Sequence, residues 1–210
     1  SVTSERAAAS IDIGSFNIRY ANDADGPNAW KHRAPMVIAM LREAELWGLQ
    51  EALPEQSAAS AAALPEYSVI ARTREPDPAK GEACPILYRH DRWEADPVEQ
   101  GTFWLSETPD VPGSKSWDSS LPRVATFARL VERSSGRAFY LVNVHLDHRG
   151  ATARREAAQL VAARFAERRH ADPVVVLGDF NTGPDSPPVR ALLDEMRLDL
   201  RDAWRAANPN

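Results

Sequence analysis

Short apolar runs, separated by Pro, Gly and polar clusters, recur along the whole chain. Seven of them have the length and the apolar patterning typical of β-strands. These cover residues 11–20, 46–51, 67–73, 85–90, 124–133, 139–147 and 174–179. Three longer segments place apolar residues at helical spacing, namely 30–42, 153–169 and 188–196. An alanine-rich stretch at 57–63 is typical of a short solvated helix.

Several of the expected strands are apolar on both faces, which indicates burial on both sides. Together with the intervening helices, this pattern predicts a layered α/β protein. No linker divides the chain, so we expect a single domain over residues 1–210. One long loop, at 106–122, contains three prolines and a glycine among Ser and Asp. Loops of this size inside a compact domain are usually functional or disordered.

Four of the strands end in polar residues that share a face with apolar core positions, because side chains two apart along a strand point the same way. If these strands are neighbours, their polar ends converge at one edge of the core. The residues concerned are Asn17, Glu51, His145, Asp179 and Asn181, with Asn143 on the same face as His145. Each residue alone has an ordinary explanation as a turn former, a hydrogen-bonded structural residue or a solvated charge. Burying so many polar groups is costly unless they serve a shared purpose.

The chemistry of this set is that of hard oxygen and nitrogen donors, which suits Mg²⁺ or Mn²⁺ better than a soft metal. Such an ion lowers the pKa of bound water and screens phosphate charge, as phosphoester hydrolysis requires. The sequence contains no Ser-His-Asp elbow, P-loop or GxGxxG motif, so acyl transfer, nucleotide-driven motors and dinucleotide chemistry have no support.

Composition and charge exclude several further classes of protein and of site. The chain has 30 acidic and 25 basic residues, a net charge of −5, which argues against a surface devoted to nucleic acid or anionic membrane. The single cysteine, Cys84, excludes an intramolecular disulfide framework and a multi-cysteine zinc site. No apolar run approaches the roughly 18 residues of a membrane span. Whether such a soluble protein is cytoplasmic or exported is left open.

Five segments, in order, resemble the endonuclease/exonuclease/phosphatase family, whose members include deoxyribonuclease I, AP endonucleases, sphingomyelinases, inositol polyphosphate 5-phosphatases and deadenylases. The segments are SFNIRY (15–20), GLQEA (48–52), ILYR (86–89), NVHLDH (143–148) and GDFN (178–181). The resemblance implies a four-layer α/β sandwich with two packed mixed β-sheets. It also implies a divalent-metal-dependent phosphoester hydrolase, with Glu51 as the principal ligand of Mg²⁺ or Mn²⁺ and Asn17 beside it.

The resemblance also assigns roles in catalysis. His145 would contact the scissile phosphate and stabilise its developing charge. Asp179 would orient or deprotonate the attacking water, and Asn181 would hold a phosphate oxygen. Tyr88 would touch the phosphate or steady the site, although it also suits a half-buried strand position.

Segments 101–118 and 26–33 resemble a bacterial branch of the family whose substrates are poorly defined. Through the long loop, Trp104, Trp117 and Asp118 are candidates to line the cleft, and Arg123 and Asp147 are further candidates for substrate binding. Trp104 would otherwise cover the open end of the sandwich, and Arg123 would otherwise form a surface salt bridge. The chain lacks a basic stripe for duplex DNA, and Thr182 and Gly183 follow GDFN where inositol phosphatases continue GDxNxR. A small-molecule, lipid-headgroup or glycan-linked phosphate is therefore favoured over long nucleic acid.

The family pattern closes with an Asp-His pair that has no counterpart after Asn181. We therefore expect a domain that is C-terminally incomplete relative to the family, with a missing segment or a second chain as its complement. We also expect the 210 residues alone to be weakly active or inactive, with an unpaired sheet edge prone to association. The alternatives to an active phosphodiesterase or phosphatase are a non-catalytic phosphate-binding module, an inactive fragment of such an enzyme, and a nuclease.

Overall fold

Strands and helices follow one another throughout residues 10–209, the part of the chain that the computed structural model describes. The strands are β1 (Ile13–Asn17), β2 (Leu46–Gln50), β3 (Tyr67–Ile70), β4 (Ile86–Arg89), β5 (Trp93–Trp104), β6 (Val124–Glu132), β7 (Ala138–His145) and β8 (Val174–Asp179). The helices are α1 (Trp30–Leu41), α2 (Pro54–Ala63), α3 (Ala151–Ala166), α4 (Pro187–Leu193) and α5 (Ala203–Ala207), with a 3₁₀ segment η1 (Asp23–Asn28).

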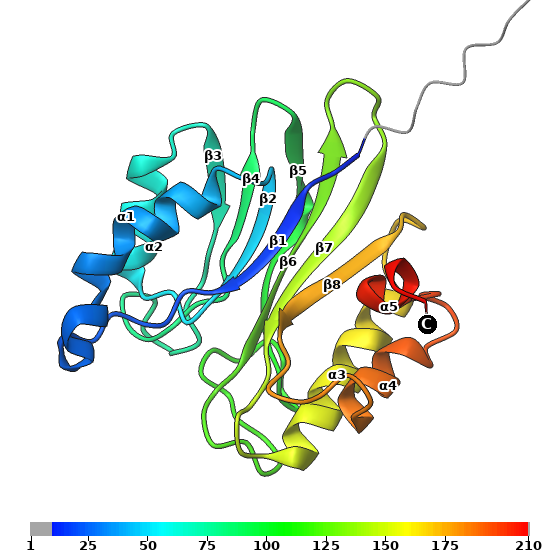
Figure 1. Ribbon diagram of the computed structural model, residues 1–210. Coiled ribbons are helices and arrows are strands. Elements are labelled where there is room, and N and C mark those ends of the chain that lie inside the picture. The colour runs from blue at the N-terminus through cyan, green and yellow to red at the C-terminus, as the bar shows by residue number, and fades with distance from the viewer. Residues whose placement is uncertain (1–9, 210) are drawn as a thin grey trace, which may run out of the picture.

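The strands form two four-stranded sheets that pack face to face (Figure 1). The first sheet has the order β1-β2-β4-β3 and the second the order β5-β6-β7-β8. Each sheet is mixed, because the pairs β1–β2 and β7–β8 are parallel and the others antiparallel. Helices α1 and α2 cover the outer face of the first sheet, and α3 and α4 cover that of the second (Figure 1). The expected four-layer α/β sandwich with two mixed sheets is therefore confirmed.

Three apolar clusters account for this layering. One lies between the sheets and includes the fully buried Leu46, Ile86, Leu130 and Leu141. The other two lie between each sheet and its helices. Full burial of one such side chain stabilises the fold by about 1.5–3 kcal/mol. The alternation of apolar residues on both strand faces thus reflects two cores per sheet.

Four elements differ from the sequence-based expectation, since β5, α5 and η1 were not expected and α2 is less solvated than expected. Strand β5 was not expected, because Pro97 and several acidic residues interrupt its apolar pattern, and the strand accommodates them with a bulge between Ala95 and Gln100. Helix α2 was expected to be solvated, yet it buries Gln56, whose amide donates to the carbonyl of Arg19 and accepts from the N–H of Ala21. The helix therefore anchors the loop that follows β1.

Two parallel strand pairs end at the same edge of the sandwich. Asn17 at the end of β1 pairs with Gln50 at the end of β2, and His145 at the end of β7 pairs with Asp179 at the end of β8. Strand β1 contacts β8 across the interface between the sheets. The carboxyl ends of these four strands therefore come together, as the sequence pattern predicted. Among residues 10–209, no helix combines the length and apolar character needed to cross a bilayer.

Candidate active site

Left-handed backbone marks the points where three strands end. Glu51 follows β2 with φ of 61°, Asn181 follows β8 with φ of 50°, and Arg19 follows β1 with φ of 56°. A non-glycine residue in this region costs about 1–3 kcal/mol and persists only where surrounding contacts hold it. The left-handed backbone conformation at these residues turns the chain sharply at this edge. Such concentrations of strain are common at functional sites.

A single amide joins two carboxylates at this edge. The Nδ2 atom of Asn17 donates to Oε1 of Glu51 at 2.9 Å and to Oδ2 of Asp179 at 3.0 Å. Its Oδ1 accepts from the N–H of Arg19 at 2.9 Å, and the N–H of Tyr20 donates to Oε2 of Glu51 at 3.2 Å. These bonds fix the orientation of the Asn17 amide. They also hold a glutamate of the first sheet beside an aspartate of the second.

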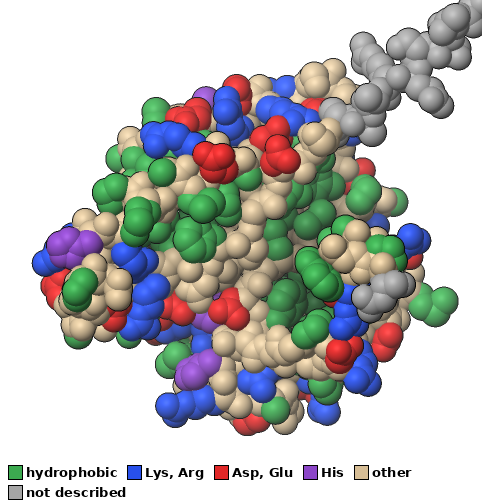
Figure 2. All heavy atoms as spheres, in the orientation of Figure 1, with side chains coloured by type: hydrophobic (Ala, Val, Ile, Leu, Met, Phe, Trp, Pro, Cys, Tyr) green, Lys and Arg blue, Asp and Glu red, His purple; other side chains and the backbone are tan. Residues whose placement is uncertain are grey.

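The imidazole of His145 lies next to this pair, with Nε2 3.8 Å from Oδ2 of Asp179. Burial, assisted by the positive charge of Arg123, lowers the pKa of His145 to about 4, although Asp179 opposes this effect. His145 is therefore neutral at pH 7 and acts as a hydrogen-bonding group rather than a fixed cation. Acidic and histidine side chains lie together where β1 and β8 end on the surface in Figure 2.

The carboxyl group of Asp179 is held ionised. Burial favours its neutral form, but hydrogen bonds from Asn17 and from the N–H of Asn181 outweigh burial and lower the pKa below its ordinary value. The Nδ2 atom of Asn181 donates to the carbonyl of Leu146 at 2.9 Å. Asn181 thus ties the turn after β8 to the segment after β7, and one of its two amide protons is used in doing so.

The oxygen donors at this edge suit a hard divalent cation. Mg²⁺ commonly binds through one or two carboxylates and retains several water molecules. Glu51 and Asp179 supply two carboxylates. Asn17 turns its Nδ2 toward them and its Oδ1 toward the N–H of Arg19, so in this arrangement it does not offer the amide oxygen that the family resemblance implied for a cation. Within residues 10–209, no three His, Cys, Asp or Glu side chains cluster so as to hold a metal ion by themselves. Water and phosphate oxygens would therefore complete the shell of a bound cation.

The structure does not bring Tyr88 to this edge. Tyr88 pairs with Leu46, the first residue of β2, whereas Glu51 follows the last residue of that strand. Because β4 runs antiparallel to β2, its last residues lie at the far end of the sheet. Tyr88 packs against the core between the sheets, in agreement with its ordinary strand role.

Trp104 is also placed differently from the expectation that it binds substrate. Its side chain is buried, and its Nε1 donates to the carbonyl of Arg74 at 2.7 Å. It packs with Cys84 and Val124, and the guanidinium of Arg72 lies 5.3 Å from its ring. Trp104 therefore covers the end of the sandwich, the alternative that the sequence left open.

The carboxylate of Asp147 organises a loop and has no capacity left for substrate. Its oxygens accept hydrogen bonds from Ser120, Leu121, Arg149 and Gly150, at distances from 2.7 to 3.3 Å. These bonds hold its pKa below the ordinary range against the opposing effect of burial. Asp147 therefore fastens the end of the long loop to the turn before α3.

Arg123 is buried beside the site instead of forming a surface salt bridge. Its Nη2 lies 3.0 Å from Nδ1 of His148, and its Nε lies 3.6 Å from Oδ2 of Asp147. It lines a very small cavity together with His145 and Arg74. Burial and the neighbouring Arg74 lower the pKa of Arg123. Arg123 and His145 thus share this cavity, and the positive charge of Arg123 acts on the imidazole.

Sequence reasoning did not identify Arg74 and His148 as neighbours of this charge. His148 closes the NVHLDH segment that also contains His145. Its position in that motif could therefore have marked it as a neighbour of the site. Arg74 belongs to a loop that ordinary patterning leaves unassigned, and its guanidinium forms two hydrogen bonds with Glu82 at 2.9 and 3.0 Å. Only the folded chain brings that loop to Arg123.

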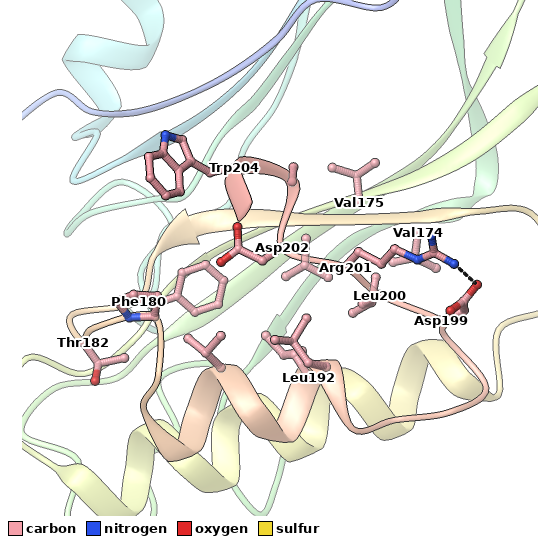
Figure 3. A pocket seen from close by; sticks show the side chains of 15 residues that line it. Val174, Val175, Phe180, Thr182, Leu192, Asp199, Leu200, Arg201, Asp202 and Trp204 are labelled. Atoms are coloured by element: carbon pink, nitrogen blue, oxygen red, sulfur yellow. Dashed lines mark ion pairs between the residues drawn. The ribbon is translucent and has the colours of Figure 1, made fainter. Parts of the chain in front are cut away.

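A large apolar groove lies outside this site, along β8. Its volume is about 680 Å³, and β8, α4 and the segment 199–204 form its walls. Phe180, Leu192 and Leu200 line its interior in Figure 3, and Trp204 lies at its rim. Its lining lacks histidine, and its charged groups include an ion pair between Arg201 and Asp199 at 3.7 Å. The groove therefore offers apolar contact rather than catalytic chemistry.

Comparisons with known proteins agree with this architecture. The model of the Endonuclease/Exonuclease/phosphatase family matches residues 14–210. An endonuclease/exonuclease/phosphatase structure from Bacteroides vulgatus is 35% identical with a TM-score of 0.85, and the match covers 89% of this chain and 72% of that one. A mannosyl-6-phosphatase structure from Bacteroides thetaiotaomicron is 36% identical with a TM-score of 0.83, covering 89% of this chain and 71% of that one.

A curated relative is more distant. An uncharacterized protein of Acanthamoeba polyphaga mimivirus is 26% identical over 122 residues, which is 57% of this chain and 44% of the viral protein. The match thus spans less than half of that relative. The human Nocturnin catalytic domain, at 17% identity and a TM-score of 0.70, shares the fold.

Proposed function

Because this chain belongs to the endonuclease/exonuclease/phosphatase family, we propose that it hydrolyses phosphoesters with the help of a divalent metal ion. The observation that supports this most directly is the carboxylate pair bridged by Asn17, with Glu51 on one side and Asp179 on the other. A neutral imidazole, that of His145, lies within 4 Å of the same aspartate. An oxygen-rich site next to a neutral hydrogen-bonding group suits a phosphate and its attacking water.

Glu51 would hold the cation, Mg²⁺ or Mn²⁺, and Asn17, which donates to Glu51 and Asp179, would keep the two carboxylates in place around it. When bound, that ion would neutralise phosphate charge and acidify water. As the water oxygen bonds to phosphorus and the ester P–O bond breaks, Asp179, which is held ionised by its hydrogen bonds, accepts the proton of the water, and the leaving alkoxide takes a proton from solvent. His145 donates an N–H to a phosphate oxygen and stabilises its negative charge, and Arg123 adds a positive potential. Asn181 orients the phosphate with the amide proton not bonded to Leu146.

The substrate we favour is a phosphate on a small molecule or glycan. The mannosyl-6-phosphatase from Bacteroides thetaiotaomicron is 36% identical to this chain. The net charge of −5 also disfavours a long polyanion as substrate, because duplex affinity depends mainly on neutralising phosphates with basic residues.

Phosphate release from mannose 6-phosphate, compared with hydrolysis of bis(p-nitrophenyl) phosphate, tests both the reaction and the preference. We expect turnover with Mg²⁺ or Mn²⁺, weak for the 210 residues alone, together with loss of turnover in EDTA and a higher kcat/KM for the monoester. Glu51→Ala should abolish metal-dependent turnover and weaken Mn²⁺ binding measured by electron paramagnetic resonance. Glu55→Ala, which removes an exposed carboxylate from α2, is the matched control.

Two outcomes would contradict the proposal. Absence of both metal-dependent turnover and Glu51-dependent Mn²⁺ binding would refute a metal-dependent hydrolase. Unchanged affinity for inorganic phosphate in the Glu51→Ala variant, without turnover in the unmodified chain, would instead identify a non-catalytic phosphate-binding module.

A further inference from the structure

A buried pair of amides joins the two sheets directly behind the candidate active site. Nε2 of Gln50, in β2, donates to Oδ1 of Asn143, in β7, at 2.8 Å. Nδ2 of Asn143 donates to the carbonyls of Leu49 and Pro85 at 2.7 and 2.9 Å. Both amide side chains are almost fully buried, at 1% exposure for Gln50 and 0% for Asn143. The amide of Asn143 therefore uses both of its N–H groups and its carbonyl on the first sheet.

The backbone of β2 is shaped to admit this bridge. A Cβ atom at Gly48 would lie 2.8 Å from Cγ of Asn143 and 2.1 Å from Cδ1 of Leu177. No side chain fits at such distances without displacing its neighbours. Glycine at this position therefore lets β2 approach β7 and β8 closely enough for the amides to bond.

The bridge lies close to the site residues in the chain. Gln50 immediately precedes Glu51, and Asn143 lies two residues before His145 on the same face of β7. Asn143 also pairs with Leu177, which lies two residues before Asp179 in β8. A shift of one sheet along the other would change the Gln50–Asn143 contact and the separation between Glu51 and Asp179 together.

We propose that Gln50 and Asn143 are positioning residues that set the offset between the two sheets and thereby hold Glu51 against Asp179. This inference rests on the proposed function for its catalytic consequence. Apolar contacts between sheets are non-directional and tolerate sliding, whereas hydrogen bonds weaken steeply with misalignment. The amide pair therefore supplies directional restraint that the surrounding leucines do not.

The double variant Gln50→Leu/Asn143→Leu tests this role, because two leucines fill similar volumes without leaving one amide unpaired. The side-chain amide resonances of Asn17 report the carboxylate bridge and need neither metal nor substrate. We expect these resonances to shift in the double variant. We also expect Mn²⁺ affinity to fall at least fivefold and kcat to fall at least tenfold, with KM changed less than threefold.

Leu130→Ala is the matched control, since Leu130 lies in the core between the sheets but outside the site. It should lower the melting temperature at least as much as the double variant, while leaving the Asn17 resonances, Mn²⁺ affinity and kcat within twofold of the unmodified chain. Unchanged Asn17 resonances in a folded double variant would overturn the positioning role. If the double variant fails to fold, Gln50→Leu, which removes the amide bridge but leaves both N–H groups of Asn143 bonded to Leu49 and Pro85, is measured in its place. Lack of turnover in the unmodified chain would count against the proposed function alone.

Discussion

At the scale of single residues, burial decides which polar groups are chemically useful. His145 and Asp147 are both buried near the strand ends, yet Asp147 has its oxygens occupied by a loop, whereas His145 faces Asp179. Cys84 lies in the same region, and burial raises the pKa of its thiol to about 12, so it is not a nucleophile. Position near a site is therefore not sufficient for a role in it.

The depressed pKa of His145 predicts a pH dependence of stability. Between pH 6.5 and about 4, the unfolded chain binds a proton that the folded chain does not, so the free energy of unfolding falls as the pH falls. The full loss is about 3 kcal/mol, from a shift of between two and three pH units. Urea unfolding at pH 4–7 measures it. His145→Gln should flatten this dependence, whereas His32→Gln, at an exposed position, should leave it intact.

Replacement of the aspartate tests the assignment of the general base. Asp179→Asn keeps the size of the side chain but removes the proton acceptor, so kcat should fall by about 10²–10⁴-fold. Steady-state kinetics with saturating Mg²⁺ measures this. Asp185→Asn, which removes an exposed carboxylate from the same loop region, should change kcat less than twofold. Equal activity in the two variants would eliminate Asp179 as the base.

At the scale of elements, strand ends and close backbone contacts fix the geometry. Strand β8 contributes Asp179 and lies parallel to β7, which contributes His145. The two strands approach closely at Gly178, where φ is 144° and a Cβ atom would lie 2.0 Å from the carbonyl oxygen of Val144. The residue before Asp179 must therefore be glycine for the two strands to pair as they do.

Gly178→Ala should consequently destabilise the protein strongly. The expected loss is about 3 kcal/mol, because the methyl group meets backbone that cannot move aside and the φ angle disfavours alanine. Gly183→Ala is the control, since nothing lies within 4 Å of its would-be Cβ atom, and its effect should stay within about 0.5 kcal/mol. Chemical denaturation of both variants measures the difference. Similar stabilities would show that β7 and β8 are not held at this spacing.

At the scale of the whole molecule, the edge that carries the candidate active site and the apolar groove are separate features. The site lies where the two sheets meet, whereas the groove follows β8, which pairs only with β7 within residues 10–209. Trp204 at the groove is 72% exposed. Apolar patches beside an unpaired strand edge promote association between chains.

We therefore expect the chain to self-associate through this groove at high concentration. Trp204→Glu should reduce the apparent mass in sedimentation velocity, because a charge at the rim opposes apolar contact. Met36→Glu, on α1 and 66% exposed, makes the same chemical change over a different sheet and should leave association unchanged. Equal reduction by both variants would show a general effect of charge instead.

Much of the fold followed from the chain itself. The period of apolar residues located seven strands and the main helices, because each face of a buried strand must be apolar in a four-layer sandwich. Side chains two apart along a strand share a face, and this rule predicted the convergence of four polar residues at one edge, namely Asn17, Glu51, His145 and Asp179. Strand β5 escaped the pattern because Pro97 and a bulge interrupt it.

Tertiary structure decided which neighbours each polar group has. Tyr88 belongs to a motif in the sequence, but the antiparallel direction of β4 takes it to the opposite end of the sheet. From the sequence, Asp147 and Trp104 were candidates for substrate binding. In the structure, hydrogen bonds to nearby loops occupy the polar atoms of both side chains. The link between Gln50 and Asn143 joins residues 93 apart in the chain. Periodicity within a strand fixes which face a side chain occupies, whereas hydrogen bonding between distant segments depends on the packing of the whole chain.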